Sequence, residues 1–164
     1  MGRRGVNYLL DTHALLWALT EPAALGAQAT RIIADADQHL VVSAATAWEI
    51  STKQRLGRLP QADGIVSTYA RNLERLGASE LPITAEHALL AGRLDWDHRD
   101  PFDRILAAQA MTEALTVITK DAAFATLPGI RRLWRSSGPT PPPPAPPLRR
   151  CGRMDVPPVP SCGG

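Results

Sequence analysis

The sequence predicts an α/β fold, a three-layer α/β/α sandwich around a central parallel sheet. Short apolar runs alternate with segments of helical periodicity along residues 1–135. Helix-capping residues stand at the junctions between these segments. A chain of about 135 residues is also long enough to bury a single core without disulfides or structural metals. Strands that alternate with helices imply βαβ units, whose parallel sheet is covered on both faces.

The first half of the chain contains two short apolar runs, each followed by helical segments. In chain order the expected elements are a strand at 8–10, helices at 13–19 and 25–36, a strand at 39–42, and helices at 44–55 and 61–76. Ser43 is a suitable N-cap for the helix that contains Glu49, and Gly77 is a normal helix end. Asp11 therefore falls at the carboxyl end of the first strand.

The second half repeats the alternation with stronger capping signals. The expected elements are a strand at 81–83, a helix at 85–93, a loop at 94–99, a helix at 101–114, a strand at 115–118 and a last short strand at 130–133. Pro82 suits a sheet edge, because proline cannot donate a ladder hydrogen bond. Thr84 and Asp100 are N-caps, and Pro101 occupies the first helical position.

Residues 136–164 form a proline-rich tail, which we expect to be disordered and separate from the folded domain at 1–135. Ten of the fifteen prolines and both cysteines follow Arg135. Residues 1–135 hold equal numbers of basic and acidic side chains, so the net charge of +2 resides in the tail and no strongly basic surface is indicated. We expect a cytoplasmic protein without a disulfide framework, signal peptide or membrane span.

Four carboxylates carry the chemical signal. Asp11 follows the first strand, Asp121 follows the strand at 115–118, and Asp103 lies in the first turn of the helix between them. Glu49 lies on an apolar helix face, where an unpaired carboxylate would be costly to bury. If the first and fourth strands are neighbours, these side chains share one crevice. A divalent cation such as Mg²⁺ would relieve their repulsion and support phosphodiester hydrolysis.

Three segments and one shorter motif match a known family in order and spacing. They are LLDTHALLW at 9–17, VSAATAWEI at 42–50, HRDPFDRIL at 98–106 and TKD at 119–121. Together they resemble the PIN-domain ribonucleases, specifically the VapC-type toxins of bacterial toxin–antitoxin pairs. The resemblance runs from about residue 8 to residue 134 and excludes the tail. It implies a PIN-like fold and an endoribonuclease that depends on Mg²⁺ or Mn²⁺ and leaves 5′ phosphates.

The resemblance also assigns residues and partners. The catalytic quartet it implies is Asp11, Glu49, Asp103 and Asp121. The metal ligands would be Asp11, Asp103 and Asp121, with Glu49 and the neighbouring Asp100 as secondary ligands. Thr12 and Thr119 would support the acids through their hydroxyls. The best candidates for RNA phosphate contacts are Lys53, Arg99, Arg104 and Lys120. The implied partners are an RNA substrate, a second copy of the chain in a homodimer, and a small antitoxin that blocks the site.

Simpler interpretations exist for several of these residues. An aspartate after a strand is often only a helix N-cap, which fits Asp100 best, and Glu49 has Lys53 four residues away as an ion-pair partner. We do not expect metal ligation by His13, Asp97 or His98, because a packing face or a solvated loop accounts for them.

The tryptophans and the fold class leave further alternatives. We expect Trp17, Trp48 and Trp134 in the core, and Trp96 as the loop tryptophan best placed to stack on bases. One alternative function is a catalytically silent PIN-fold module that binds RNA or a partner. Another is a receiver-like signalling domain, which is disfavoured because Thr12 and His13 follow Asp11 where receivers carry a second acid.

Overall fold

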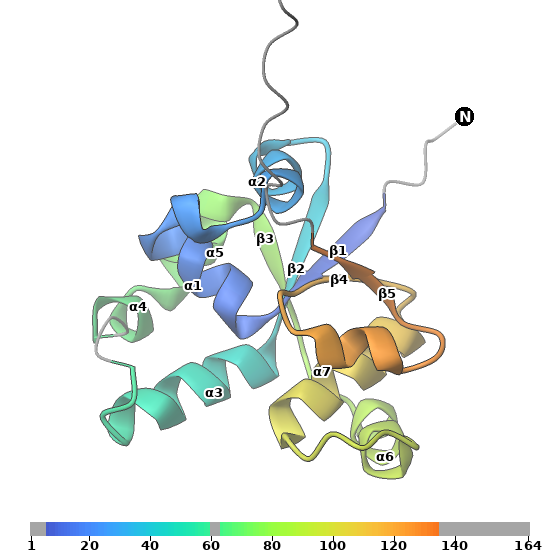
Figure 1. Ribbon diagram of the computed structural model, residues 1–164. Coiled ribbons are helices and arrows are strands. Elements are labelled where there is room, and N and C mark those ends of the chain that lie inside the picture. The colour runs from blue at the N-terminus through green and yellow to red at the C-terminus, as the bar shows by residue number, and fades with distance from the viewer. Residues whose placement is uncertain (1–5, 60–62, 135–164) are drawn as a thin grey trace, which may run out of the picture.

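A five-stranded parallel sheet with helices on both faces forms the centre of the computed structural model, which describes residues 6–59 and 63–134 (Figure 1). The strands are β1 (Asn7–Leu10), β2 (His39–Ser43), β3 (Ala78–Leu81), β4 (Thr116–Ile118) and β5 (Arg131–Leu133). This arrangement confirms the predicted fold class. The predicted disorder of residues 136–164 lies outside the described residues.

The strand order is β3-β2-β1-β4-β5, and every neighbouring pair is parallel. The chain works outward from β1 to β3 and then returns to the other side of β1 with β4. This order differs from the 2-1-3-4-5 order of flavodoxin-like sheets, which receivers share, so the receiver-like alternative is wrong. Ligands of such sheets bind beyond the carboxyl ends of the strands, where the order reverses. Here that position lies between β1 and β4.

The helices follow the strands closely. They are α1 (Thr12–Thr20), α2 (Ala27–Ala34), α3 (Ala44–Arg55), α4 (Asp63–Ser67), α5 (Tyr69–Leu76), α6 (Ala85–Arg93) and α7 (Pro101–Thr112), with short 3-10 helices at Pro22–Ala24 and Ala122–Thr126. The side chain of Ser43 caps α3, and Thr84 forms a capping box with His87 at the start of α6. Gly77 ends α5 in the left-handed conformation, at a φ of 63°.

Alternate residues of each strand face opposite layers. On one face Leu10, Val42 and Ile118 join a buried cluster with residues of α1 to α5. On the other face Leu9, Val41 and Val117 pack against α7, Trp96 and Phe124. α6 packs on α7 at the outside of this second layer. The sheet is therefore buried on both sides, which explains its nearly continuous apolar strands.

Some predicted boundaries were wrong for identifiable reasons. The strand expected at 81–83 lies at Ala78–Leu81, on the sheet edge, and ends before Pro82. The helix expected at 25–36 begins only after Gly26, which caps α2 without a side-chain bond. The helical segment at 61–76 is divided at Thr68, whose ψ of 17° interrupts the helix, and its first two residues lie outside the described part. No helix in the described ranges is long and apolar enough to cross a membrane.

Candidate functional site

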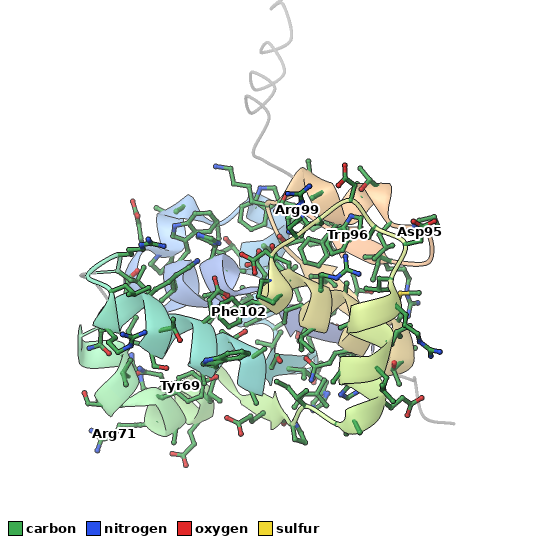
Figure 2. The ribbon with its side chains drawn as sticks, turned by 90° about the horizontal axis from the view of Figure 1, so that it is seen from below. Tyr69, Arg71, Asp95, Trp96, Arg99 and Phe102 are labelled. Atoms are coloured by element: carbon green, nitrogen blue, oxygen red, sulfur yellow. The ribbon has the colours of Figure 1, made fainter. Side chains whose placement is uncertain are left out.

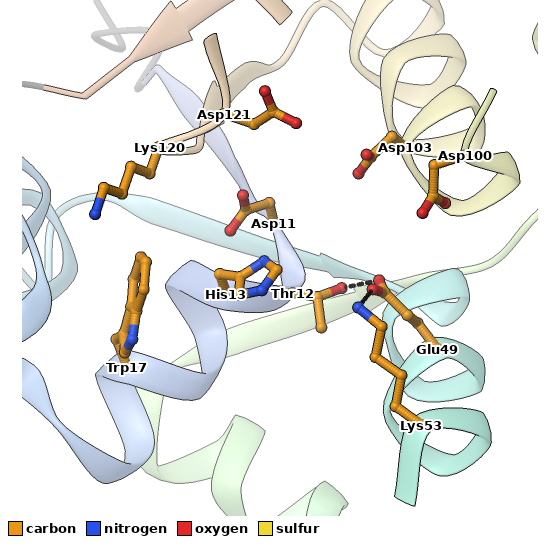
Figure 3. A pocket seen from close by; sticks show the side chains of 10 residues that line it. All are labelled: Asp11, Thr12, His13, Trp17, Glu49, Lys53, Asp100, Asp103, Lys120 and Asp121. Atoms are coloured by element: carbon orange, nitrogen blue, oxygen red, sulfur yellow. Dashed lines mark hydrogen bonds and ion pairs between the residues drawn. The ribbon is translucent and has the colours of Figure 1, made fainter. Parts of the chain in front are cut away.

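A pocket of about 390 Å³ opens at the carboxyl ends of β1 and β4 (Figure 3). It gathers the acidic residues that the sequence analysis singled out, although they come from four separate segments of the chain. The residues that line it are Asp11, Thr12, His13, Trp17, Glu49, Lys53, Asp100, Asp103, Lys120 and Asp121. The neighbouring positions of β1 and β4 explain why Asp11 and Asp121 meet here.

Three of the aspartates are helix N-caps and pocket residues at the same time. Oδ1 of Asp11 accepts a hydrogen bond from the backbone N–H of Ala14 at 2.6 Å. Asp100 and Asp121 cap the next helices in the same way, each through Oδ1. The capping interpretation is therefore right but incomplete, because each cap engages only Oδ1 of a carboxylate that also lines the pocket.

Glu49 is held by two partners on the α3 side of the pocket. The Thr12 hydroxyl donates to Oε2 of Glu49, and the Lys53 ammonium pairs with Oε1. Glu49 is 5% exposed, so this pairing offsets the cost of burying its charge. The expected ion pair with Lys53 thus exists inside the pocket.

Asp103 lies across the pocket in the first turn of α7, and its partner is one that the sequence analysis set aside. Oδ2 of Asp103 is 2.6 Å from Nε2 of His98. Ligand atoms of His98, Asp103 and Asp121 all lie within 4.8 Å of one another. Asp11 and Glu49 line the same pocket but are not members of this close group. The expectation that the loop histidine is merely solvated was wrong.

The loop from residue 94 to residue 99 carries His98 and is fastened by Arg104. The guanidinium of Arg104 donates to the backbone carbonyls of Ala91, Leu94, Trp96 and His98, at distances between 2.7 and 3.0 Å. Arg104 does not line the pocket, and these four bonds occupy most of its donors, which leaves it less available for the phosphate contact that we predicted. A sequence offers little signal for such a clamp, since it depends on the path of the loop.

Burial dominates the electrostatics of the pocket acids. Burial raises the pKa of Asp11, against the opposing effect of hydrogen bonds from Thr119 and from the Ala14 backbone. The pKa of Asp103 is raised to about 6, mainly by burial and also by the charges of Asp100 and Glu49, against the opposing effect of the hydrogen bond to His98. A buried carboxylate with a raised pKa lacks a sufficient positive partner. The pocket thus favours uptake of a proton or a cation.

The basic candidates are distributed unevenly. Lys53 and Lys120 line the pocket, and Lys53 is already paired with Glu49. The ammonium of Lys120 lies 5.7 Å from the centre of the Trp17 ring, at the pocket edge. Arg99 is exposed on the loop before α7, and it is labelled in Figure 2. Of these residues, Lys120 is the cation best placed to meet a substrate at the pocket.

Thr12 and Thr119 lie where we expected them, whereas His13 does not. Thr12 bonds Glu49, and the buried Thr119 accepts a hydrogen bond from the backbone N–H of Asp121 at 3.0 Å. Both threonines therefore support pocket acids. His13 is exposed and lines the pocket, so the packing face that we expected for it was wrong.

Trp96 and Trp48 have the opposite burial from the one we predicted. Trp96 is 9% exposed, packs edge-on against Phe124, and donates from Nε1 to the Thr126 hydroxyl. Trp48 is 56% exposed and stands against Phe102 with ring centres 4.8 Å apart. Helical spacing alone could not distinguish the sheet-facing side of α3 from its outer side. Trp17 and Trp134 are half-buried and pack together, as expected for the edge of a core.

The donor set fits a divalent cation. Five carboxylates and two lysines line the pocket, and one lysine is taken up by Glu49. Carboxylate oxygens are the ligands that Mg²⁺ and Mn²⁺ prefer. The raised pKa of Asp103 agrees with a site whose negative charge is not balanced by the chain itself. The residues that could hold the ion are Asp103 and Asp121, with Asp11 from the floor of the pocket.

Comparisons with known proteins identify the family of the chain. The family model of the PIN domain matches residues 8–130. A curated relative, Ribonuclease VapC16 of Mycobacterium tuberculosis, is 38% identical over 62 residues, which is 38% of this chain and 43% of the relative. The match therefore spans less than half the length of that relative.

Solved structures share the fold at low sequence identity. A chain in the crystal structure of VapBC2 from Rickettsia felis, bound to a DNA fragment from its promoter, aligns with a TM-score of 0.60 and 16% identity, covering 79% of this chain and all of that one. A chain in DNA-bound VapBC from Salmonella typhimurium aligns with a TM-score of 0.58 and 18% identity, covering 78% and 97%. The family match extends over all the pocket residues, and the chain belongs to the PIN domain family.

Proposed function

We propose that this chain is a metal-dependent endoribonuclease and the toxin component of a toxin–antitoxin pair. The observation that carries the proposal is the acidic pocket at the carboxyl ends of β1 and β4, inside the segment that matches the PIN domain. The likeness to Ribonuclease VapC16 supports RNA as the substrate. We place the activity in the cytoplasm, where RNA is available.

The position of each pocket residue suggests its role. Asp103 and Asp121 would hold a divalent ion, Mg²⁺ or Mn²⁺, with Asp11 as a further ligand and Asp100 beside them. A bound ion supplies Lewis acidity at the scissile phosphate and favours the ionised form of water. Glu49, positioned by Thr12 and Lys53, accepts a hydrogen bond from the attacking water and orients it. Thr119 positions Asp11 and the backbone that carries Asp121.

Substrate contacts lie at the rim of the same pocket. The exposed Lys120 offers a positive charge to a phosphate, and the half-buried Trp17 offers a ring face beside it. Stacking of one base on an aromatic side chain contributes about 1–3 kcal/mol and is tolerant of sequence. Arg99, exposed on the loop before α7, is a second phosphate contact.

Protein partners have an apolar surface available. A groove of about 500 Å³ between α3, α4 and the start of α5 is lined by Ala47, Trp48, Ile50, Ser51, Val66 and Tyr69. Exposed apolar residues gathered in a groove mark interaction sites. We propose that an antitoxin binds the chain and that two copies form a homodimer. The VapBC complexes among the structural neighbours support the antitoxin partner.

Cleavage of total bacterial RNA by the purified, antitoxin-free chain tests the activity. The reactions contain Mg²⁺, Mn²⁺ or EDTA, and the new ends are mapped. We expect discrete cuts with 5′ phosphates that vanish in EDTA and in Asp11→Asn. The matched control is Asp37→Asn, because Asp37 is an exposed acid on the turn before β2, at the opposite end of the strands. It should cut like the wild type.

The alternative outcome is equally informative. If the folded wild-type chain binds RNA but no metal produces cuts, the chain is the catalytically silent binding module. If Asp11→Asn is folded and cuts at the wild-type rate, the assignment of the acidic pocket is wrong. Light scattering of the purified chain measures the homodimer directly, and a monomer mass would remove that part of the proposal.

A further inference from the structure

We propose that His98 is a direct nitrogen ligand of the metal site and that it makes the pocket select Mn²⁺ over Mg²⁺. This inference rests on the metal site of the proposed function and goes beyond its carboxylates. The resemblance that we found in the sequence assigns only acids to this site, whereas the structure brings a histidine to it. The candidate ligands are His98, Asp103 and Asp121, from the loop before α7, from α7 and from the end of β4.

The spacing of the three side chains suits one ion. Nε2 of His98 is 2.6 Å from Oδ2 of Asp103, and all three ligand atoms lie within 4.8 Å of one another. With metal–ligand distances of about 2.1 Å, neighbouring ligand atoms of an octahedral ion are about 3 Å apart and opposite ones about 4.2 Å. The hydrogen-bonded pair thus already has nearly the separation of two neighbouring ligands, and an ion can replace the shared proton with small side-chain movements.

The ring of His98 is held in this orientation by its surroundings. It stacks on Trp96, with ring centres 4.5 Å apart and planes tilted by 30°. Trp96 is itself buried and anchored by its hydrogen bond to Thr126. Arg104 holds the backbone carbonyl of His98 at 3.0 Å. Because packing and hydrogen bonds fix the ring before an ion arrives, ligation requires little further ordering.

The consequence for metal choice follows from ligand chemistry. Mg²⁺ binds oxygen ligands and gives up its water reluctantly, so an imidazole adds little to its affinity. First-row transition ions accept imidazole nitrogen more readily than Mg²⁺ does, although Mn²⁺ stands at the weak end of a series whose affinity rises towards Cu²⁺. A site of one imidazole and two carboxylates therefore favours Mn²⁺ over Mg²⁺ more strongly than the carboxylates alone would.

A positioning role is the competing interpretation. In that case the His98 N–H donates to Asp103 and orients the carboxylate, while the ion binds only oxygens. The two interpretations differ in one observable, which is whether a histidine nitrogen is bonded to the ion. Pulsed electron paramagnetic resonance of bound Mn²⁺ detects a coordinated ¹⁴N directly, without any RNA substrate.

The experiment uses the full chain titrated with Mn²⁺ alone. We expect a ¹⁴N coupling in the wild type, its replacement by a ¹⁵N coupling after labelling of histidine, and its loss in His98→Gln. The matched control is His13→Gln, because His13 lines the same pocket and is not a member of the close group. This variant should keep the coupling. We further expect His98→Gln to weaken Mn²⁺ binding about 10-fold or more, and Mg²⁺ binding by less than threefold.

Several outcomes would overturn the inference. A wild-type spectrum without nitrogen coupling excludes His98 as a ligand, and this measurement needs no variant to fold. A coupling that persists in folded His98→Gln, or disappears in His13→Gln, assigns the nitrogen elsewhere. The proposed function fails separately: RNA cleavage without the coupling leaves the nuclease intact, and a coupling without cleavage leaves only the metal ligand.

Discussion

The acidic pocket has one wall formed by α3 and another formed by α7, and the two walls accommodate buried carboxylates differently. On the α3 wall, Glu49 is neutralised by Lys53 and bonded by Thr12, so its charge is balanced within the chain. On the α7 wall, Asp103 meets only His98, lies close to the carboxylates of Asp100 and Asp121, and has a pKa raised to about 6. Both walls line one cavity, yet among the residues that the structure describes only the α3 wall pairs its carboxylate with a lysine.

The charge of Glu49 is therefore compensated within the protein, whereas the charge of Asp103 requires a bound ligand for compensation. In a buried ion pair with satisfied hydrogen bonds, removing one partner leaves the other as an uncompensated buried charge and destabilises the fold. A cluster without a cation costs stability until an ion binds, and binding then returns that free energy. Charge removal on the two walls should therefore change stability in opposite directions.

The largest effect is expected for Asp103→Asn. Removing this carboxylate takes a ligand from the metal, and we expect RNA cleavage to fall about 100-fold or more, since loss of such stabilisation is worth several kcal/mol. The same change should raise the stability of the metal-free protein, because a poorly compensated buried charge disappears. Cleavage rates and urea unfolding in EDTA measure the two effects.

Asp97→Asn is the control for that variant, because Asp97 is exposed on the loop before α7 and lies outside the pocket lining. It should change neither quantity. If Asp103→Asn were less stable than the wild type in EDTA, the Asp103 carboxylate would not destabilise the metal-free protein. The two walls would then not differ as we propose.

Lys53→Met should act in the opposite direction on the α3 wall. The buried Glu49 carboxylate would keep only its Thr12 partner, and leaving a buried group without its partner costs about 1–3 kcal/mol. Urea unfolding should show this loss. The double variant Glu49→Gln, Lys53→Met should regain much of it, because the charge that needed a partner is gone. A double variant as unstable as the single one would show that the lysine acts through packing alone.

The sequence predicted the α3 wall better than the α7 wall, because the Glu49–Lys53 pair lies on a regular helix whereas His98 lies on an irregular loop. Lys53 lies one helical turn from Glu49, so periodicity alone places them together. Asp11 and Asp121 follow apolar strands, and the rule for parallel sheets brings their strand ends to one edge. The fold class and the acidic pocket were therefore accessible from local patterns.

The α7 wall depends on a loop whose path no periodicity specifies. His98 reaches Asp103 because Trp96 is buried beneath it and Arg104 binds the loop carbonyls. The sequence showed that this loop is rich in metal-ligand types but could not show which of them faces inward. The same limit explains Trp48, whose helix face was interpreted as core although its ring is exposed.

The pH dependence of stability distinguishes the walls more finely. The pKa of Asp103 in the folded protein, about 6, lies above its ordinary value of 3.8. A raised carboxyl pKa means that the folded state is penalised in full above about pH 6, and that the penalty disappears as the pH falls towards 3.8. The metal-free wild type should therefore approach the stability of Asp103→Asn between pH 7.5 and pH 5. Parallel pH profiles of the two proteins in urea unfolding would contradict this.

The smallest effect is expected at the pocket rim, where the exposed charge of Lys120 belongs to neither wall. Lys120→Met should weaken RNA binding only a few-fold, because a solvated ammonium contributes little at physiological salt. The plot of log Kd against log salt concentration should lose about 0.7 of its slope, as expected for one phosphate of a single strand. Arg71→Met, on the exposed side of α5, is the matched control and should leave the slope unchanged.

Variants of Lys120 also test whether this lysine neutralises the acids of the α7 wall. If Lys120 contacts phosphate and does not neutralise the pocket acids, Lys120→Arg should restore the salt slope, and Lys120→Met should leave Mn²⁺ affinity within about twofold, as expected for a charge screened by water. A large gain in Mn²⁺ affinity in Lys120→Met would mean that Lys120 competes with the ion for Asp121, its chain neighbour. The α7 wall would then have a cation of its own, and the two walls would differ only in how firmly theirs is held.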